Sequence, residues 1–85
     1  MNKITVYTSS FCGYCIAAKS LLSKKGVPFE EINLSTSPEL REDVVEKWQW
    51  RTLPLIIIND NLIGGFRELA MLESSNKLDS LINSD

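Results

Sequence analysis

Apolar and polar residues alternate over the first segment of the chain and then change to a helical spacing. Residues 3–8 alternate with a period of two, which predicts a strand. Across 14–25 apolar residues recur three or four positions apart, which predicts a helix that ends in a turn and cap at Gly26. Residues 28–34 carry a second strand-like pattern. The chain therefore begins with the strand, helix and strand of a parallel crossover.

A second helix is indicated in the middle of the chain. Ser37, Pro38 and Glu39 have the order of an N-cap, a first-turn proline and an early acid. Every fourth residue is then apolar, which predicts a helix to about residue 49 with Trp48 in the core. Trp50 falls off this stripe, and we do not expect it to line a binding groove.

The last third of the chain predicts a hairpin followed by a helix. Residues 54–58 are a short apolar run typical of a strand buried on both faces. Four segments follow: a turn at 59–61, a partner strand at 62–63, a break at Gly64 and Gly65, and a helix from Phe66 interrupted near 74–76. The predicted order is βαβαββα. We expect an α/β fold with one four-stranded mixed sheet flanked by three or more helices.

Composition and charge narrow the class of protein. The 85 residues suit a single domain spanning 1–85. The formal net charge of −2 offers no basic excess for nucleic acid, and no apolar run reaches the ~20 residues of a membrane span. The first seven residues lack the apolar core of a signal peptide. We therefore expect a cytoplasmic protein with neither a nucleic-acid nor a membrane partner.

The only two cysteines, Cys12 and Cys15, stand two residues apart between the first strand and the first helix. This spacing permits a disulfide that opens and closes without unfolding the protein. A thiolate at a helix start faces unpaired amide donors, and C-x-x-C motifs can lower a thiol pKa from ~8.5 to roughly 3.5–7.5. The absence of histidine excludes a Cys–His catalytic pair and a closed Cys/His zinc site within one chain. The motif predicts a thiol–disulfide oxidoreductase with Cys12 as its nucleophile.

Three separated signals together resemble a known family. They are the C-G-Y-C motif at 12–15, Thr52-Leu53-Pro54 before the third predicted strand, and Gly64-Gly65 before the last helix. With the βαβαββα order, the chain resembles glutaredoxins, the glutathione-dependent branch of the thioredoxin fold, over essentially its whole length. The family's usual dithiol motif is Cys-Pro-Tyr-Cys, so Gly13 is a departure.

The resemblance implies roles for particular residues. Cys12 would attack the disulfide and Cys15 would be the resolving thiol. Leu53, before a cis proline, would present its backbone to glutathione, and helix-start amides would hold the γ-glutamyl carboxylate. Glutathione would be a co-substrate, with no tightly bound cofactor and no metal. The implied glutathione-binding residues are Tyr14, Arg51, Thr52, Leu53, Pro54, Gly65, Phe66 and Arg67.

Two departures from the family pattern concern charge. Ser9 and Ser10 replace a lysine commonly found shortly before the first cysteine, and the usual acidic pair after the two glycines appears as Arg67-Glu68. Arg51 or Lys19 would then grip the glycyl carboxylate of glutathione. We expect the side chains of Arg67 and Glu68 to form a solvated first turn whose backbone matters more.

The partners that the resemblance implies are glutathione and disulfide-bonded or glutathionylated client proteins, with the chain acting as a monomer. One alternative is a [2Fe–2S] carrier in which Cys12 from each of two chains and two glutathiones ligate the cluster; Gly13 favours it, since related glutaredoxins with C-G-Y-C can hold clusters. Another is a glutaredoxin-like electron donor served by a thioredoxin-type reductase.

Overall fold

The computed structural model describes residues 3–82, so residues 1, 2 and 83–85 of the expected domain lie outside the described part. The order βαβαββα is confirmed, with a short 3₁₀ turn added and the last helix divided in two. The elements are β1 (Ile4–Thr8), α1 (Gly13–Lys24), β2 (Glu30–Asn33), η1 (Leu34–Thr36), α2 (Pro38–Trp48), β3 (Leu55–Ile58), β4 (Asn61–Gly64), α3 (Phe66–Ser74) and α4 (Leu78–Ile82).

The four strands form one mixed sheet in the order β2-β1-β3-β4. β1 and β2 are parallel, with Val6 opposite Glu31, and α1 connects them. β3 runs antiparallel to both β1 and β4. Because β1 and β3 are antiparallel neighbours, the C-terminal end of β1 lies beside the N-terminal end of β3. The segment after β1 and the segment before β3 therefore lie at the same end of the sheet.

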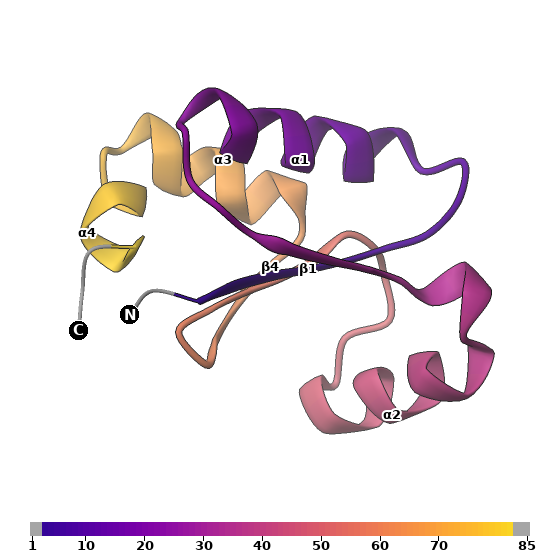
Figure 1. The fold of residues 1–85 in the computed structure, drawn as a ribbon. Helices are drawn as coiled ribbons and strands as arrows, with labels where there is room; N and C mark the ends of the chain where they lie inside the picture. Colours follow the sequence, from indigo (N-terminus) through magenta and orange to yellow (C-terminus); the bar gives the residue numbers. More distant parts are fainter. Residues whose placement is uncertain (1–2, 83–85) are drawn as a thin grey trace.

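Helices cover both faces of the sheet (Figure 1). α1, α3 and α4 lie on one face, where Leu22, Leu69 and Leu78 join a buried cluster with residues of β1 and β3. α2 lies on the opposite face, where Val44 packs in a second cluster. The four residues of β3 are all buried and serve both clusters, as the apolar run predicts.

One lysine connects the three helices that cover one face of the sheet, at the C-terminal end of α1. The Lys25 ammonium, just after α1, lies 2.8 Å from a carboxylate oxygen of Glu73 and 2.8 Å from one of Asp79. The hydrogen bonds that the Lys25 ammonium donates to Asp79 and Glu73 raise the pKa of Lys25 above its ordinary value. This contact joins the end of α1 to α3 and α4.

The predicted boundaries differ from the observed ones by at most two residues. The second strand ends at Asn33 because its side chain accepts a hydrogen bond from the Ser35 N–H at 2.8 Å and turns the chain into η1. Asn61 belongs to β4 and not to the turn. Trp48 is half-buried against the second cluster rather than fully enclosed. Within residues 3–82 no helix is long and apolar enough to span a membrane.

Candidate functional site

The two cysteines lie at the first turn of α1 and form a disulfide. Cys12 is the N-cap of the helix, and its sulfur accepts a hydrogen bond from the Cys15 N–H at 3.1 Å. Cys15 is 2% exposed, whereas Cys12 is half-buried. The first turn of α1 holds no acidic residue. Cys12 is thus the accessible sulfur, in a position where amide donors favour its thiolate form.

Polar contacts to neighbouring elements fix the loop that contains Cys12. The buried Thr8 hydroxyl donates to Glu31 at 2.9 Å, and the Lys19 ammonium lies 3.0 Å from the same oxygen. The Lys19 ammonium and the Thr8 hydroxyl hold the pKa of the Glu31 carboxyl below its ordinary value. The Ser10 N–H also donates to the Ser35 hydroxyl at 2.9 Å. β1, β2, α1 and η1 therefore share in fixing this loop.

The segment before β3 approaches the disulfide. The peptide bond between Leu53 and Pro54 is cis, as the resemblance implies. The Leu53 carbonyl oxygen lies 3.7 Å from the Cys12 sulfur. A disulfide sulfur has no proton to donate, so in the oxidised protein this is a contact and not a hydrogen bond. The backbone of Leu53 is nevertheless beside the reactive sulfur.

The two glycines at the junction of β4 and α3 place the start of α3 near the same site. Gly65 is the N-cap of α3, and its N–H donates to the Glu68 carboxylate at 2.8 Å. Gly64 has a φ of 121°, a conformation that side chains disfavour. A Cβ there would lie 3.0 Å from Glu68 Cγ and 3.2 Å from the Trp50 ring. Only glycine lets β4 pass so close to α3 and Trp50.

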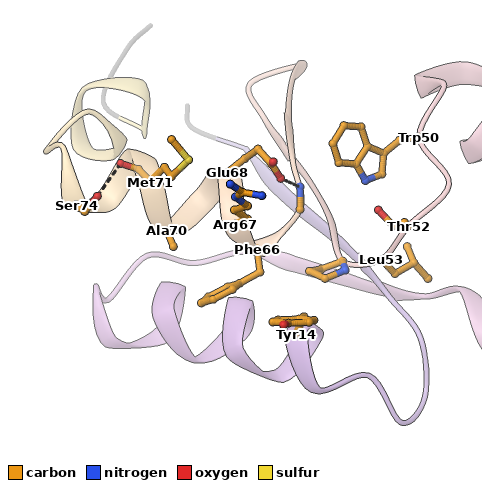
Figure 2. A pocket seen from close by; sticks show the side chains of 12 residues that line it. Tyr14, Trp50, Thr52, Leu53, Phe66, Arg67, Glu68, Ala70, Met71 and Ser74 are labelled. Atoms are coloured by element: carbon orange, nitrogen blue, oxygen red, sulfur yellow. Dashed lines mark hydrogen bonds between the residues drawn. The ribbon is translucent and has the colours of Figure 1, made fainter.

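A groove of about 960 Å³ runs along these elements (Figure 2). Its walls come from the start of α1, the 50–54 segment and one side of α3. The rings of Tyr14 and Phe66 stack at 6.1 Å between centroids and join α1 to α3. The groove is lined by Tyr14, Trp50, Thr52, Leu53, Pro54, Gly65, Phe66, Arg67, Glu68, Ala70, Met71 and Ser74.

The structure brings together seven of the eight implied glutathione-binding residues, and Arg51 is the exception. Arg51 is exposed and lines a separate depression together with residues of α2, among them Arg41 and Glu46. Lys19, the other proposed cation, already pairs with Glu31. The cationic side chain that does line the groove is Arg67.

Sequence reasoning missed five residues of the groove wall, which are Trp50, Glu68, Ala70, Met71 and Ser74. Trp50 lines the groove and packs on the second core cluster, and its indole Nε1 is buried with no hydrogen-bond partner within residues 3–82. Its placement follows from Gln49, whose φ of 54° ends α2 and redirects the chain. Glu68 is held by the Gly65 N–H instead of being merely solvated. The Gly65-x-x-Glu68 spacing, which matches half of a capping box, could have indicated it.

The described residues contain no metal site of their own. Within 3–82, no three His, Cys, Asp or Glu side chains lie together in a way that could hold a metal ion. An iron–sulfur cluster needs four ligands, typically thiolates. Of the two cysteine sulfurs only that of Cys12 is accessible, so any cluster would require thiolate ligands from outside the chain.

The family model, the similar sequences and the similar structures all point to one protein family. The glutaredoxin family model matches residues 4–63. A glutaredoxin from Pseudomonas aeruginosa is 42% identical over 84 residues, covering 99% of this chain and 100% of that protein. The solution structure of a glutaredoxin from Brucella melitensis is 41% identical with a TM-score of 0.85, covering 96% of this chain and 89% of that one. A buckwheat glutaredoxin–glutathione complex has a TM-score of 0.88 at 24% identity, covers 95% of this chain and 76% of that one, and shares the fold.

Proposed function

The chain belongs to the glutaredoxin family, whose members are thiol–disulfide oxidoreductases, and we propose that it uses glutathione to reduce glutathionylated and disulfide-bonded proteins through Cys12 and Cys15. The observation that most strongly supports this proposal is the difference in exposure between the two cysteine sulfurs. Cys12 is accessible beside Leu53 at the groove, while Cys15 is buried behind it.

For a glutathionylated protein, the Cys12 thiolate attacks the glutathione sulfur of the mixed disulfide. The bond between glutathione and the client breaks, and the client sulfur leaves with the electron pair and takes up a proton. A second glutathione thiolate then attacks the Cys12–glutathione disulfide. Oxidised glutathione departs, and the Cys12 thiolate is regenerated. The protein ends unchanged, so the net reductant is glutathione.

For a disulfide-bonded client, Cys12 forms a mixed disulfide with one client sulfur and releases the other as a thiol. Cys15 then attacks Cys12, which frees the second client thiol and closes the Cys12–Cys15 bond. Two glutathiones reopen that bond and leave as oxidised glutathione. The 5.2 Å between the two Cα atoms lies within the range usual for disulfides, which supports this step.

The groove supports a binding mode for glutathione. The Leu53 backbone would hydrogen-bond the cysteine of glutathione, and Tyr14 would flank its sulfur. The first-turn amides of α3, at Phe66 and Arg67, have no partners within their own helix, so they suit the γ-glutamyl carboxylate. The Arg67 side chain would reach a carboxylate of the same ligand. Each of these groups lines the groove.

The test is glutathione-dependent reduction of a glutathionylated peptide, coupled to glutathione reductase. We expect turnover that rises with glutathione concentration and is abolished in Cys12→Ser. Turnover no faster than the uncatalysed reaction would contradict the proposal. Glutathione-independent turnover with a thioredoxin-type reductase would instead favour the electron-donor alternative.

A [2Fe–2S] carrier is the second candidate, supported by the open space over the motif. A Cβ at Gly13 would meet nothing within 4 Å, so the surface beside Cys12 could receive a second chain with its own cysteine and glutathione. Visible absorbance after anaerobic purification or reconstitution is expected on this proposal. Colourless protein after reconstitution would rule it out. A cytoplasmic location and a monomeric free protein stay predictions from the sequence.

A further inference from the structure

Phe11, the residue before Cys12, is fully exposed in an unusual backbone conformation. Its relative exposure is 106%, and its φ is 60°. A bulky residue in the left-handed region is an outlier that costs free energy. Full exposure means that packing within the chain does not offset this cost. Because Phe11 combines this exposure and backbone conformation with a place beside the reactive sulfur, we expect a binding partner to contact its ring.

A second exposed apolar side chain lies one helical turn after Cys12. Ile16 is 64% exposed, and its N–H donates to the Cys12 carbonyl oxygen at 3.2 Å. Residues four apart on a helix share a face, so Ile16 lies on the side of α1 that bears Cys12. Neither Phe11 nor Ile16 lines the groove. We call these two residues the Phe11 patch; Tyr14, which is 70% exposed and follows Cys12 by two residues, lines the groove.

The chain segment that contains Phe11 and Ile16 has no charged residues. Residues 4–18 contain no Asp, Glu, Lys or Arg, although these make up 24% of the chain. The next cation along the chain, Lys19, is paired with Glu31. Residues 4–18 therefore contribute no electrostatic steering, and recognition by Phe11 and Ile16 rests on apolar contact.

We propose that the Phe11 patch binds the client segment that flanks the target cysteine, and that it selects clients with apolar residues next to that cysteine. This inference rests on the proposed function. During attack, the groove holds the glutathione half of the mixed disulfide. The client half remains tethered at the Cys12 sulfur, and an extended chain advances only ~3.3 Å per residue. The neighbours of the client cysteine therefore lie within reach of Phe11 and Ile16.

The test uses two glutathionylated peptides that are identical except at the residues flanking the cysteine, which are leucine in one and serine in the other. We expect the wild-type protein to favour the leucine peptide about tenfold in kcat/KM, the scale of burying part of one aromatic and one aliphatic side chain. Phe11→Asn should reduce this preference to about twofold. Asparagine tolerates a positive φ, so the loop conformation is retained. Phe11→Leu should keep most of the preference.

Leu40→Ser is the matched control, because Leu40 is also an exposed apolar residue, at 37%, but belongs to α2. It should leave the preference unchanged. No preference in the wild-type protein, or an equal loss on both peptides in Phe11→Asn, would overturn the inference. Self-association of the wild-type protein that Phe11→Asn abolishes would also overturn it, since a second copy would then cover the patch.

A single-turnover measurement keeps this test separate from the proposed function. Reduced protein is mixed with the disulfide-linked dimer of each peptide in the absence of glutathione. Cys12 and Cys15 lose two electrons and two protons to the peptide disulfide, which yields two peptide thiols. The same preference for leucine flanks is expected. If only the glutathione-coupled assay fails, the glutathione step is wrong and the patch stands; if the single-turnover rates are equal, the patch is wrong.

Discussion

At the scale of single residues, the groove presents few charges to a ligand. Among the described residues that line the groove, Arg67 and Glu68 are the charged ones. The Glu68 carboxylate is already bound to the Gly65 N–H, which leaves the Arg67 guanidinium to meet a ligand carboxylate. Arg51 has the same charge but lies on the α2 side of the molecule. The two arginines therefore form a natural comparison.

Arg67→Gln should raise the KM for glutathione about three- to tenfold, the scale of one charge-assisted hydrogen bond. Arg51→Gln should change it little, because this side chain lies outside the groove. The measurement is the initial rate against glutathione concentration with a fixed glutathionylated peptide. A larger effect from Arg51→Gln would mean that the carboxylate is held from the α2 side.

The Glu31 carboxylate makes the free energy of unfolding depend on pH. Its pKa is lowered in the folded protein by the Lys19 ammonium and then by the Thr8 hydroxyl. The stabilisation is therefore present above the ordinary value of 4.5 and is lost as the pH falls through the lower folded-state pKa. The pair is partly exposed, so Glu31→Gln should lower the free energy of unfolding by about 0.5–1 kcal/mol at neutral pH. Urea unfolding should show this difference shrinking at about pH 2.5, and a difference that is the same at both pH values would contradict the assignment.

At the scale of elements, the junction of β4 and α3 positions the helix start that faces the groove. Gly64 ends β4 at a φ that favours glycine, and the Trp50 ring and the Glu68 side chain occupy the space where a Cβ would lie. Gly65 then begins α3 with its N–H bound to Glu68. The amides of the first turn can face a ligand only if this close packing is kept.

Gly64→Ala should lower the free energy of unfolding by about 2–4 kcal/mol, because backbone strain and steric overlap add. Gly26→Ala is the matched control. Gly26 also has a positive φ, 71°, but a Cβ there meets nothing within 4 Å. It should cost only about 1–2 kcal/mol, the strain alone. Denaturant unfolding measures both, and equal losses would mean that contact with Trp50 and Glu68 contributes nothing.

At the scale of the whole molecule, the sequence predicts the elements well and the loops between them less well. The buried run of β3 and the interruption between α3 and α4 follow from hydrophobic periodicity, which reports the buried face of a regular element. Periodicity carries no information past Gln49, whose left-handed conformation turns Trp50 toward the groove while Arg51 lies outside it. The conformation of Phe11 is likewise a loop property that no pattern encodes.

The fold as a whole places the accessible Cys12 sulfur beside Leu53, which lines the groove, and buries the Cys15 sulfur behind it. The most direct test of this division uses Cys15→Ser, in which the resolving step is removed. The variant is mixed with one equivalent of glutathionylated peptide, and the products are identified by mass spectrometry. We expect glutathione bound to Cys12 and free peptide thiol in solution, because on the proposed function the groove orients glutathione for attack. Peptide bound to Cys12, or no adduct on Cys12, would contradict the account.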